Sequence, residues 1–280
     1  FVSLNKYFYL EPLLTKAPNA IQLFHTWVLC KIYIGCYSFL KACGKEVQIL
    51  DDNENILLSN LKEFESKAES PYSSQLDNDT LIQKLNIGKI ISLIETVMSI
   101  TSRQRALIFL DDAALTLTPD YFVEFLDIFR SLKTKVIAPK ASVYPGTTQY
   151  SPRFHVGHDA QFTECWMGVE NEKYSEFMES IIDTRLSSHK RIINRDVLEL
   201  MKYASFGIPR ILISLIRSFQ NSSSKEKTIQ ARFNSIIDQR AKLIEAEYLS
   251  LKEKIPQYDN VIQIGWDFFK KLTNDLKEEN

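Results

Sequence analysis

The 280-residue chain is 45% hydrophobic with a net charge of -1, which excludes a disordered or fibrous protein and gives no general reason to expect nucleic acid as its partner. Only eight glycines occur, and Leu, Ile, Lys and Glu dominate, so a helix-rich fold is favoured over an all-β sandwich or barrel. The four cysteines give no disulfide pattern and indicate a reducing compartment, which we expect to be the cytoplasm.

The first residues predict a strand and then a long buried helix. Residues 1–9 alternate apolar and polar side chains as a short strand does, without an initiating Met or a signal peptide, so we expect them to lie inside a longer protein. Residues 21–39 are strongly apolar, but Gln22, His25 and Lys31 interrupt them and argue for a core helix rather than a membrane span. Asn19 is its expected cap, and Gly44 is expected to stop it.

Residues 63–79 are rich in charge, serine and proline, which predicts an exposed, flexible insertion. A long helix is expected next. Its predicted apolar face consists of Leu81, Leu85, Ile90, Ile94, Val97 and Met98.

The middle of the chain predicts a parallel sheet. Residues 106–110 form a short apolar run typical of a strand buried on both faces. Thr118-Pro119 opens an amphipathic helix, and residues 135–138 are the next strand candidate. Strand, helix and strand at this spacing form a βαβ crossover, which requires parallel strands.

Helical periodicity continues alone after about Asp183. We therefore expect an α/β core over residues 1–183, a helical lid over 184–221 and a C-terminal helical region over 222–280. The expected helices of the last two parts are 195–204, 209–219, 229–251 and 260–277.

Two adjacent carboxylates, Asp111 and Asp112, follow the first predicted central strand, where ligands bind in open α/β sheets. Asp111 would hold Mg²⁺, largely through coordinated water, and Asp112 would polarise the water that attacks a γ-phosphate. The alternative is that both acids only cap the next helix.

A second group, Phe206-Gly207-Ile208-Pro209-Arg210, opens a later helix. Gly207 permits a tight entry, Pro209 suits the first turn, and Arg210 at a helix N-terminus can reach a phosphate. An ordinary helix start with a solvent-facing arginine is the alternative.

Together the two motifs resemble the Walker B strand and the sensor-2 Gly-x-Pro-Arg of AAA+ and STAND P-loop ATPases, in particular the origin-recognition-like branch. The chain is also similar to bacterial ATPases in which Tyr-Pro-Gly and His-x-x-His-Asp segments follow the next strand, here Tyr144-Pro145-Gly146 and residues 155–159. The resemblance implies a P-loop NTPase-like core with a helical lid, ATP and Mg²⁺ as ligands, and ATP hydrolysis coupled to a protein or DNA partner.

The chain departs from this family in its phosphate loop. No Gly-x-x-x-x-Gly-Lys-Ser/Thr occurs, and Gly44-Lys45 is followed by Glu46. We expect the loop to lie upstream of Phe1. The alternative is a degenerate, non-hydrolysing module that binds protein or DNA.

Further polar residues have two interpretations each. Lys140 or Ser142, after the second strand, is the sensor-1 candidate that the resemblance implies, and Arg153 and Arg185 are either arginine fingers or structural. His155, His158, Asp159 and Cys165 form either a zinc site or a polar loop over the nucleotide.

Residues 185–217 have an excess of positive charge that would face either DNA or solvent. The basic residues are Arg185, Lys190, Arg191, Arg195, Lys202, Arg210 and Arg217. The helices beyond Ile229 mix Lys with Glu and suit a protein partner or a homo-oligomer, and no membrane contact is expected.

Overall fold

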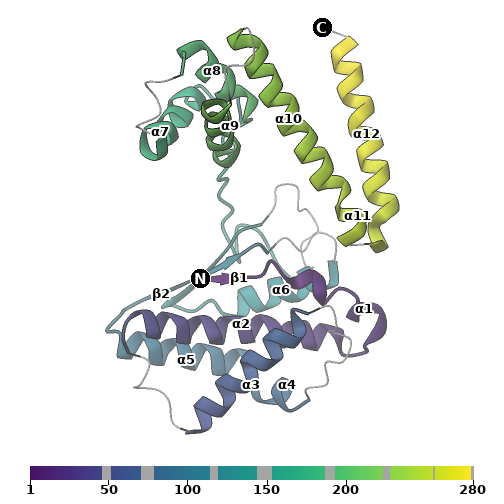
Figure 1. The fold of residues 1–280 in the computed structure, drawn as a ribbon. Coiled ribbons are helices and arrows are strands. Elements are labelled where there is room, and N and C mark those ends of the chain that lie inside the picture. Colours follow the sequence, from purple (N-terminus) through teal and green to yellow (C-terminus); the bar gives the residue numbers. More distant parts are fainter. Residues whose placement is uncertain are drawn as a thin grey trace. The chain divides into compact units, whose positions relative to one another are not determined.

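A computed structural model describes residues 1–45, 52–70, 79–113, 119–143, 153–186, 193–222, 228–254 and 256–278 (Figure 1). The chain divides into two compact units, Phe1–Phe162 and Thr163–Asn280. Each unit has a hydrophobic core of its own.

The first unit contains a small parallel sheet of β1 (Val2–Ser3), β2 (Ala106–Asp111) and β3 (Ile137–Ala141), in the order β1-β2-β3. Val2 is paired with Leu110, and Leu110 is paired with Ala141. The expectation of a helix-rich α/β unit with parallel strands is therefore confirmed. Because the strands are parallel and in register, their carboxyl ends meet at one edge.

One face of β2 is open, which differs from the expectation of a strand buried on both faces. Ile108 and Leu110 are buried, whereas Leu107 and Phe109 are exposed. An apolar run does not show whether a strand is buried on one face or on both, because that depends on how many helical layers the rest of the chain supplies. In the described part of the chain, helices cover one face only.

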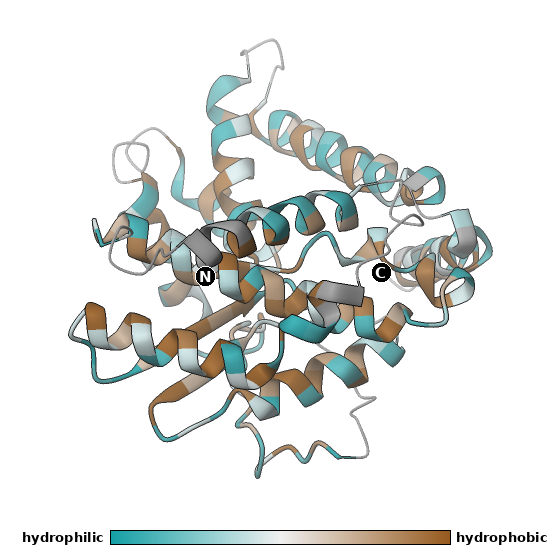
Figure 2. Ribbon diagram, turned by 90° about the horizontal axis from the view of Figure 1, so that it is seen from below, coloured by the Kyte–Doolittle hydropathy of each residue, from teal (hydrophilic) through white to brown (hydrophobic). Residues whose placement is uncertain are grey.

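The helical layer is built around α2 (Ala20–Ala42), which contacts β1 and five other helices. Apolar residues recur between polar ones along these helices (Figure 2). The largest buried side chains of this core are Phe24, Trp27, Tyr33, Phe64, Tyr121 and Phe125. The neighbouring helices are α1 (Leu13–Lys16), α3 (Asp52–Ala68), α4 (Asp79–Lys84), α5 (Ile87–Ile100) and α6 (Pro119–Ser131).

Among the described residues, α2 is long and apolar enough to cross a membrane, but 61% of its most apolar window is buried inside the protein. Buried core helices pass the same test of length and composition. The helix follows Asn19, whose side chain makes no capping hydrogen bond, and it ends just before Gly44, which has φ +65. The expected helix stop is therefore confirmed.

Two segments differ from their expected local structure. Residues 63–68 are the last turns of α3, and they bury Phe64 and Ala68 instead of forming an exposed insertion; residues 71–78 lie outside the described residues. The single long helix expected next is two helices, α4 and α5, because the Asn86 side chain accepts the Lys89 N–H and caps a new helix.

All regular elements among the described residues of the second unit are helices, and the first of them begins at Tyr174. Its core is formed by α7 (Tyr174–Leu186), α8 (Arg195–Ala204) and α9 (Pro209–Asn221), followed by α10 (Ile229–Leu249), α11 (Leu251–Lys254) and α12 (Asp259–Glu278). The periodicity predicted the bounds of α8 and the start of α9. It did not place α7 with these helices, although all three share one core. In Figure 1, α10 and α12 run antiparallel.

Candidate functional site

The two predicted acids lie at the carboxyl edge of the sheet. Asp111 is the last residue of β2 and is paired with Ser3 of β1, and Asp112 follows it directly. The Asp111 carbonyl accepts the Leu4 N–H at 2.9 Å. The backbone on which the acid pair stands is therefore fixed by the neighbouring strand.

Ser142, immediately after β3, joins the two acids. Its hydroxyl donates to Asp111 Oδ1 at 2.6 Å and accepts the Asp112 N–H at 2.9 Å. Its backbone also donates to the Leu110 carbonyl and accepts from Ala113. Of the two sensor-1 candidates, Ser142 is thus the one in direct contact with the acids.

Ser3 is a site residue that the sequence reading missed. Its hydroxyl lies 3.4 Å from Asp112 Oδ2, a long hydrogen bond across 109 positions of sequence. The alternation over residues 1–9 predicted a longer strand, but only Val2–Ser3 is extended and Tyr7–Tyr9 is a 3-10 helix. The alternation also does not show which residue meets the acid pair, so only the register of β1 against β2 identifies Ser3. The cluster therefore contains Ser3 of β1, the last residue of β2 and the residue after it, and the residue that follows β3.

Asp112 has a left-handed backbone, with φ 58. This conformation is costly for residues other than glycine, although Asp tolerates it better than most, and such strain concentrates at functional sites. The conformation directs the two successive carboxylates differently. Their hydrogen bonds within the described residues go to serines of adjacent strands and not to the first turn of α6, which argues against simple helix capping.

The cluster offers hard oxygen atoms only, namely two carboxylates and two hydroxyls. This donor set suits Mg²⁺, which keeps several waters and needs only one or two protein carboxylates. No group of three or more His, Cys, Asp or Glu side chains placed to hold a metal occurs in the described ranges. The residues therefore fit a hydrated Mg²⁺, and the described residues do not form a closed metal cage.

Lys140 lies inside β3, in register with Phe109, and its side chain is exposed. None of the acid pair's hydrogen bonds within the described residues involves it. It is two positions before Ser142, which lies just beyond the end of β3.

Gly207 and Arg210 belong to the second unit, where the turn before α9 is tightly built. The Tyr174 hydroxyl donates to the Lys202 carbonyl at 2.5 Å and accepts the Gly207 N–H at 2.8 Å. Gly207 has φ +76, and a Cβ there would lie 2.3 Å from the Met167 carbonyl oxygen. Only glycine fits this position. Arg210 lies in the first turn of α9, and its side chain is exposed.

Lys202 is buried, with 2% of its surface exposed, so its expected place on a basic, solvent-facing surface is wrong. It pairs with Glu179 and, at 2.7 Å, with Glu199, and it lies 3.4 Å from the Ser175 hydroxyl. Burial acts to lower the pKa of Lys202, but the hydrogen bonds to the two glutamates outweigh it and leave the pKa raised. Lys202 therefore anchors α7 to α8.

The remaining basic candidates are dispersed. Arg185, Arg195 and Arg217 are exposed on α7, α8 and α9, while Lys190 and Arg191 lie outside the described residues. In the first unit, the Arg153 carbonyl accepts a hydrogen bond from Arg130 at 2.9 Å.

The histidine segment forms a polar turn. Asp159 Oδ2 accepts the His155 N–H at 2.8 Å, and the His155 carbonyl accepts the N–H groups of His158 and Asp159. Cys165 is exposed in the second unit. The carboxylate is thus engaged by backbone, and no cluster of metal ligands forms here within the described part of the chain.

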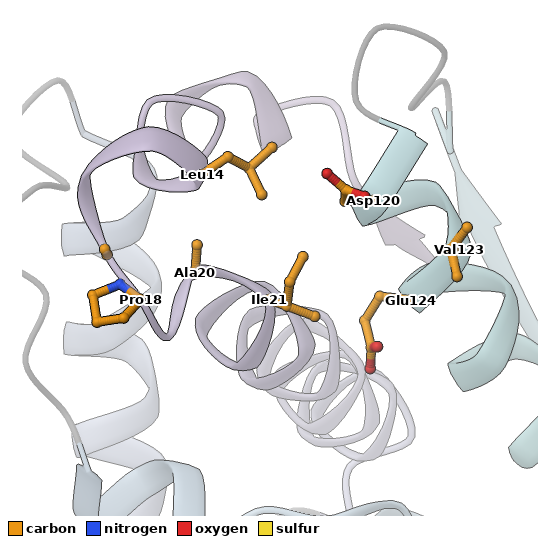
Figure 3. A pocket seen from close by; sticks show the side chains of 8 residues that line it. Leu14, Pro18, Ala20, Ile21, Asp120, Val123 and Glu124 are labelled. Carbon is orange, nitrogen blue, oxygen red and sulfur yellow. The ribbon is translucent and has the colours of Figure 1, made fainter.

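A pocket in the first unit opens between α1, α2 and α6 (Figure 3). Its rim combines the carboxylates of Asp120 and Glu124 with apolar side chains such as Leu14 and Ile21. Glu124 is also 2.5 Å from His25 Nδ1. None of the predicted site residues lines this pocket, so it is separate from the acid cluster.

Comparisons of the chain with protein-family models, with curated proteins and with solved structures found no match.

Proposed function

We propose that this chain is the core and lid of an AAA+/STAND-like ATPase, a switch that binds and hydrolyses ATP with Mg²⁺ and thereby alters its contact with a protein or DNA partner. The observation that carries the proposal is the acid pair Asp111-Asp112, held at the carboxyl edge of parallel strands by Ser142 and Ser3.

Each residue of the cluster has a role in this proposal. Asp111, with Ser142 bonded to one carboxylate oxygen, keeps the other oxygen available toward a hydrated metal. Mg²⁺ would supply charge neutralisation on the β- and γ-phosphates. Asp112 would orient and deprotonate the attacking water, and Ser142 would sense the γ-phosphate by changing partners between Asp111 and a phosphate oxygen.

The second unit supports the proposal through the start of α9. Tyr174 and Gly207 fix the turn, so Arg210 leaves a helix N-terminus whose partial positive charge also favours an anion. In the proposed switch, Arg210 contacts a phosphate of the bound nucleotide. Hydrolysis of ATP removes that contact.

The proposal requires a phosphate-binding loop that these 280 residues do not contain. Without such a loop, backbone N–H groups and a lysine for the β- and γ-phosphates are missing. That observation favours the second candidate, a non-hydrolysing module of the same architecture that binds protein or DNA.

The test starts with the coding sequence upstream of Phe1, expressed together with these residues. We expect a strand, Gly-x-x-x-x-Gly-Lys-Ser/Thr and a helix there, and Mg²⁺-dependent release of phosphate from ATP. Asp112→Asn should retain binding of a fluorescent ATP analogue and lose hydrolysis by about 100-fold or more, because it removes the base and keeps the shape.

Glu95→Gln is the matched control, since it neutralises an exposed acid of α5 in the same unit. Its turnover should equal that of the parent protein. No ATP binding by the extended protein, or equal turnover of Asp112→Asn and the parent, would overturn the proposal in favour of the second candidate.

A further inference from the structure

The last helix of the second unit has an apolar stripe that nothing in the described residues covers. Val261, Ile264, Phe268 and Leu272 are exposed on α12; Ile264 is 69% and Phe268 is 68% exposed. At about 100° per residue these four side chains lie on one side of the helix. Four large apolar side chains in a row are more than scattered surface residues, and such a stripe marks an interaction surface.

The stripe is distinct from the side of α12 that contacts its own chain. Ile262 is buried, the Trp266 ring lies 5.8 Å from that of Tyr248 in α10, and the Tyr248 hydroxyl donates to the Ile262 carbonyl. Gly265 allows the Tyr248 hydroxyl to approach, since a Cβ there would lie 2.7 Å from it. The α10–α12 hairpin is therefore held by one side of α12, and the stripe belongs to another.

We infer that this stripe is the interface between two copies of the chain, with two α12 helices packed antiparallel about a two-fold axis at Phe268. The inference does not depend on the proposed ATPase function. Under this symmetry Phe268 meets its own copy, and Ile264 of one helix lies opposite Leu272 of the other. A two-fold interface requires such self-complementarity, and the spacing of the stripe provides it.

Charge supports the antiparallel orientation. Asp267 and Lys271 are exposed and lie four residues apart along one flank of the stripe. In an antiparallel pair like flanks meet, so Asp267 of one copy lies beside Lys271 of the other, and the contact occurs twice. Asp267 and Lys271 therefore favour an antiparallel second copy of α12 over a partner whose surface is uncharged or uniformly acidic.

The oligomeric state of the 280-residue protein tests the inference. A contact of two helices lies near the lower size limit of specific interfaces, about 1,000 Å² in total, so we expect a dimer that dissociates on dilution. Multi-angle light scattering or sedimentation should show the mass rising from monomer to dimer with concentration. Phe268→Glu brings two carboxylates together at the axis and should leave only monomer, with unchanged helical circular dichroism.

Asn274→Glu is the control for added charge. Asn274 is exposed and lies about 120° around the helix from Phe268, so this variant should dimerise like the parent. Asp267→Lys alone and Lys271→Glu alone should each weaken the dimer. The double variant restores opposite charges across the axis and should recover it.

Cysteine cross-linking tests the orientation. With the exposed Cys43 and Cys165 replaced by Ser, Phe268→Cys should form a disulfide-linked dimer on mild oxidation. Val261→Cys should not, because in the antiparallel pair its copy is about 21 Å away, whereas a disulfide needs Cα atoms within about 7 Å. Cross-linking of both variants would show a parallel pair and overturn the orientation.

A protein that is monomeric at all concentrations would overturn the inference altogether. If Phe268→Glu then lowered the thermal stability of that monomer, the stripe would be covered by the same chain. If it changed neither mass nor stability, the stripe would be free or bound by a different partner.

Discussion

Replacing Tyr174 with Phe removes one hydroxyl that serves two backbone groups. The hydroxyl donates to the Lys202 carbonyl at 2.5 Å and accepts the Gly207 N–H at 2.8 Å. The Lys202 carbonyl keeps a second donor, the Ser205 hydroxyl at 2.6 Å. Losing the bond from Tyr174 to this carbonyl therefore costs only the net value of one hydrogen bond, about 1 kcal/mol. The buried Gly207 N–H loses its partner, which costs about 1–3 kcal/mol.

We therefore expect Tyr174→Phe to destabilise the second unit by about 2–4 kcal/mol. Amide hydrogen exchange read by mass spectrometry should show faster exchange over α8 and the start of α9, by a factor of about 30 to 1,000. Tyr203→Phe is the matched control, because Tyr203 is exposed and its ring lies 5.5 Å from that of Tyr174. Its effect should remain within about 0.5 kcal/mol. Equal protection in the two variants would refute the assignment of the turn's rigidity to this hydroxyl.

Three further results are expected. Gly207→Ala should lower the free energy of unfolding by about 2 kcal/mol or more in urea titrations, because of its positive φ and the Met167 carbonyl; Gly44→Ala, with φ +65 and no neighbour within 4 Å, should cost less. Iodoacetamide should label only two of the four cysteines of the native protein by peptide mass spectrometry, since burial raises the pKa of Cys30 and raises that of Cys36 to about 12. The pKa of Lys202 is raised above its ordinary value of 10.5 in the folded state, so its charge stabilises the folded state fully below pH 10.5. This contribution is lost as the pH rises through the folded-state pKa. The melting temperature should therefore fall more steeply above pH 10.5 in the parent than in Lys202→Met.

Local signals in the sequence were sufficient for the elements with strong periodicity or clear ends. The bounds of α8, the stop at Gly44 and the βαβ arrangement each depend on residues within a few positions of one another. The acids at the end of β2 and Ser142 after β3 could be placed at one edge for the same reason, because parallel strands align their carboxyl ends.

Long-range contacts could not be predicted in this way. Ser3 reaches Asp112 only through strand register, and Tyr174 reaches Gly207 across 33 positions. Lys202 looks basic and solvent-facing in the sequence, and only the packing of α7 against α8 shows that it is buried between glutamates. The open face of β2 likewise depends on the number of helical layers, which no single apolar run encodes.

Pro139 in the middle of β3 has a consequence for how this sheet can grow. The Val136 carbonyl accepts from Ala106 and the Ser142 N–H donates to Leu110, so even-numbered residues of β3 direct their backbone groups to β2. The backbone of Pro139 therefore faces away from β2, although its ring is buried. The outer edge therefore lacks a donor at its midpoint, which protects it against edge-to-edge joining of identical sheets. The exposed side chains of Leu107 and Phe109 are a separate apolar surface that the proline does not protect, so substitutions that reduce sheet-to-sheet stacking belong on that face.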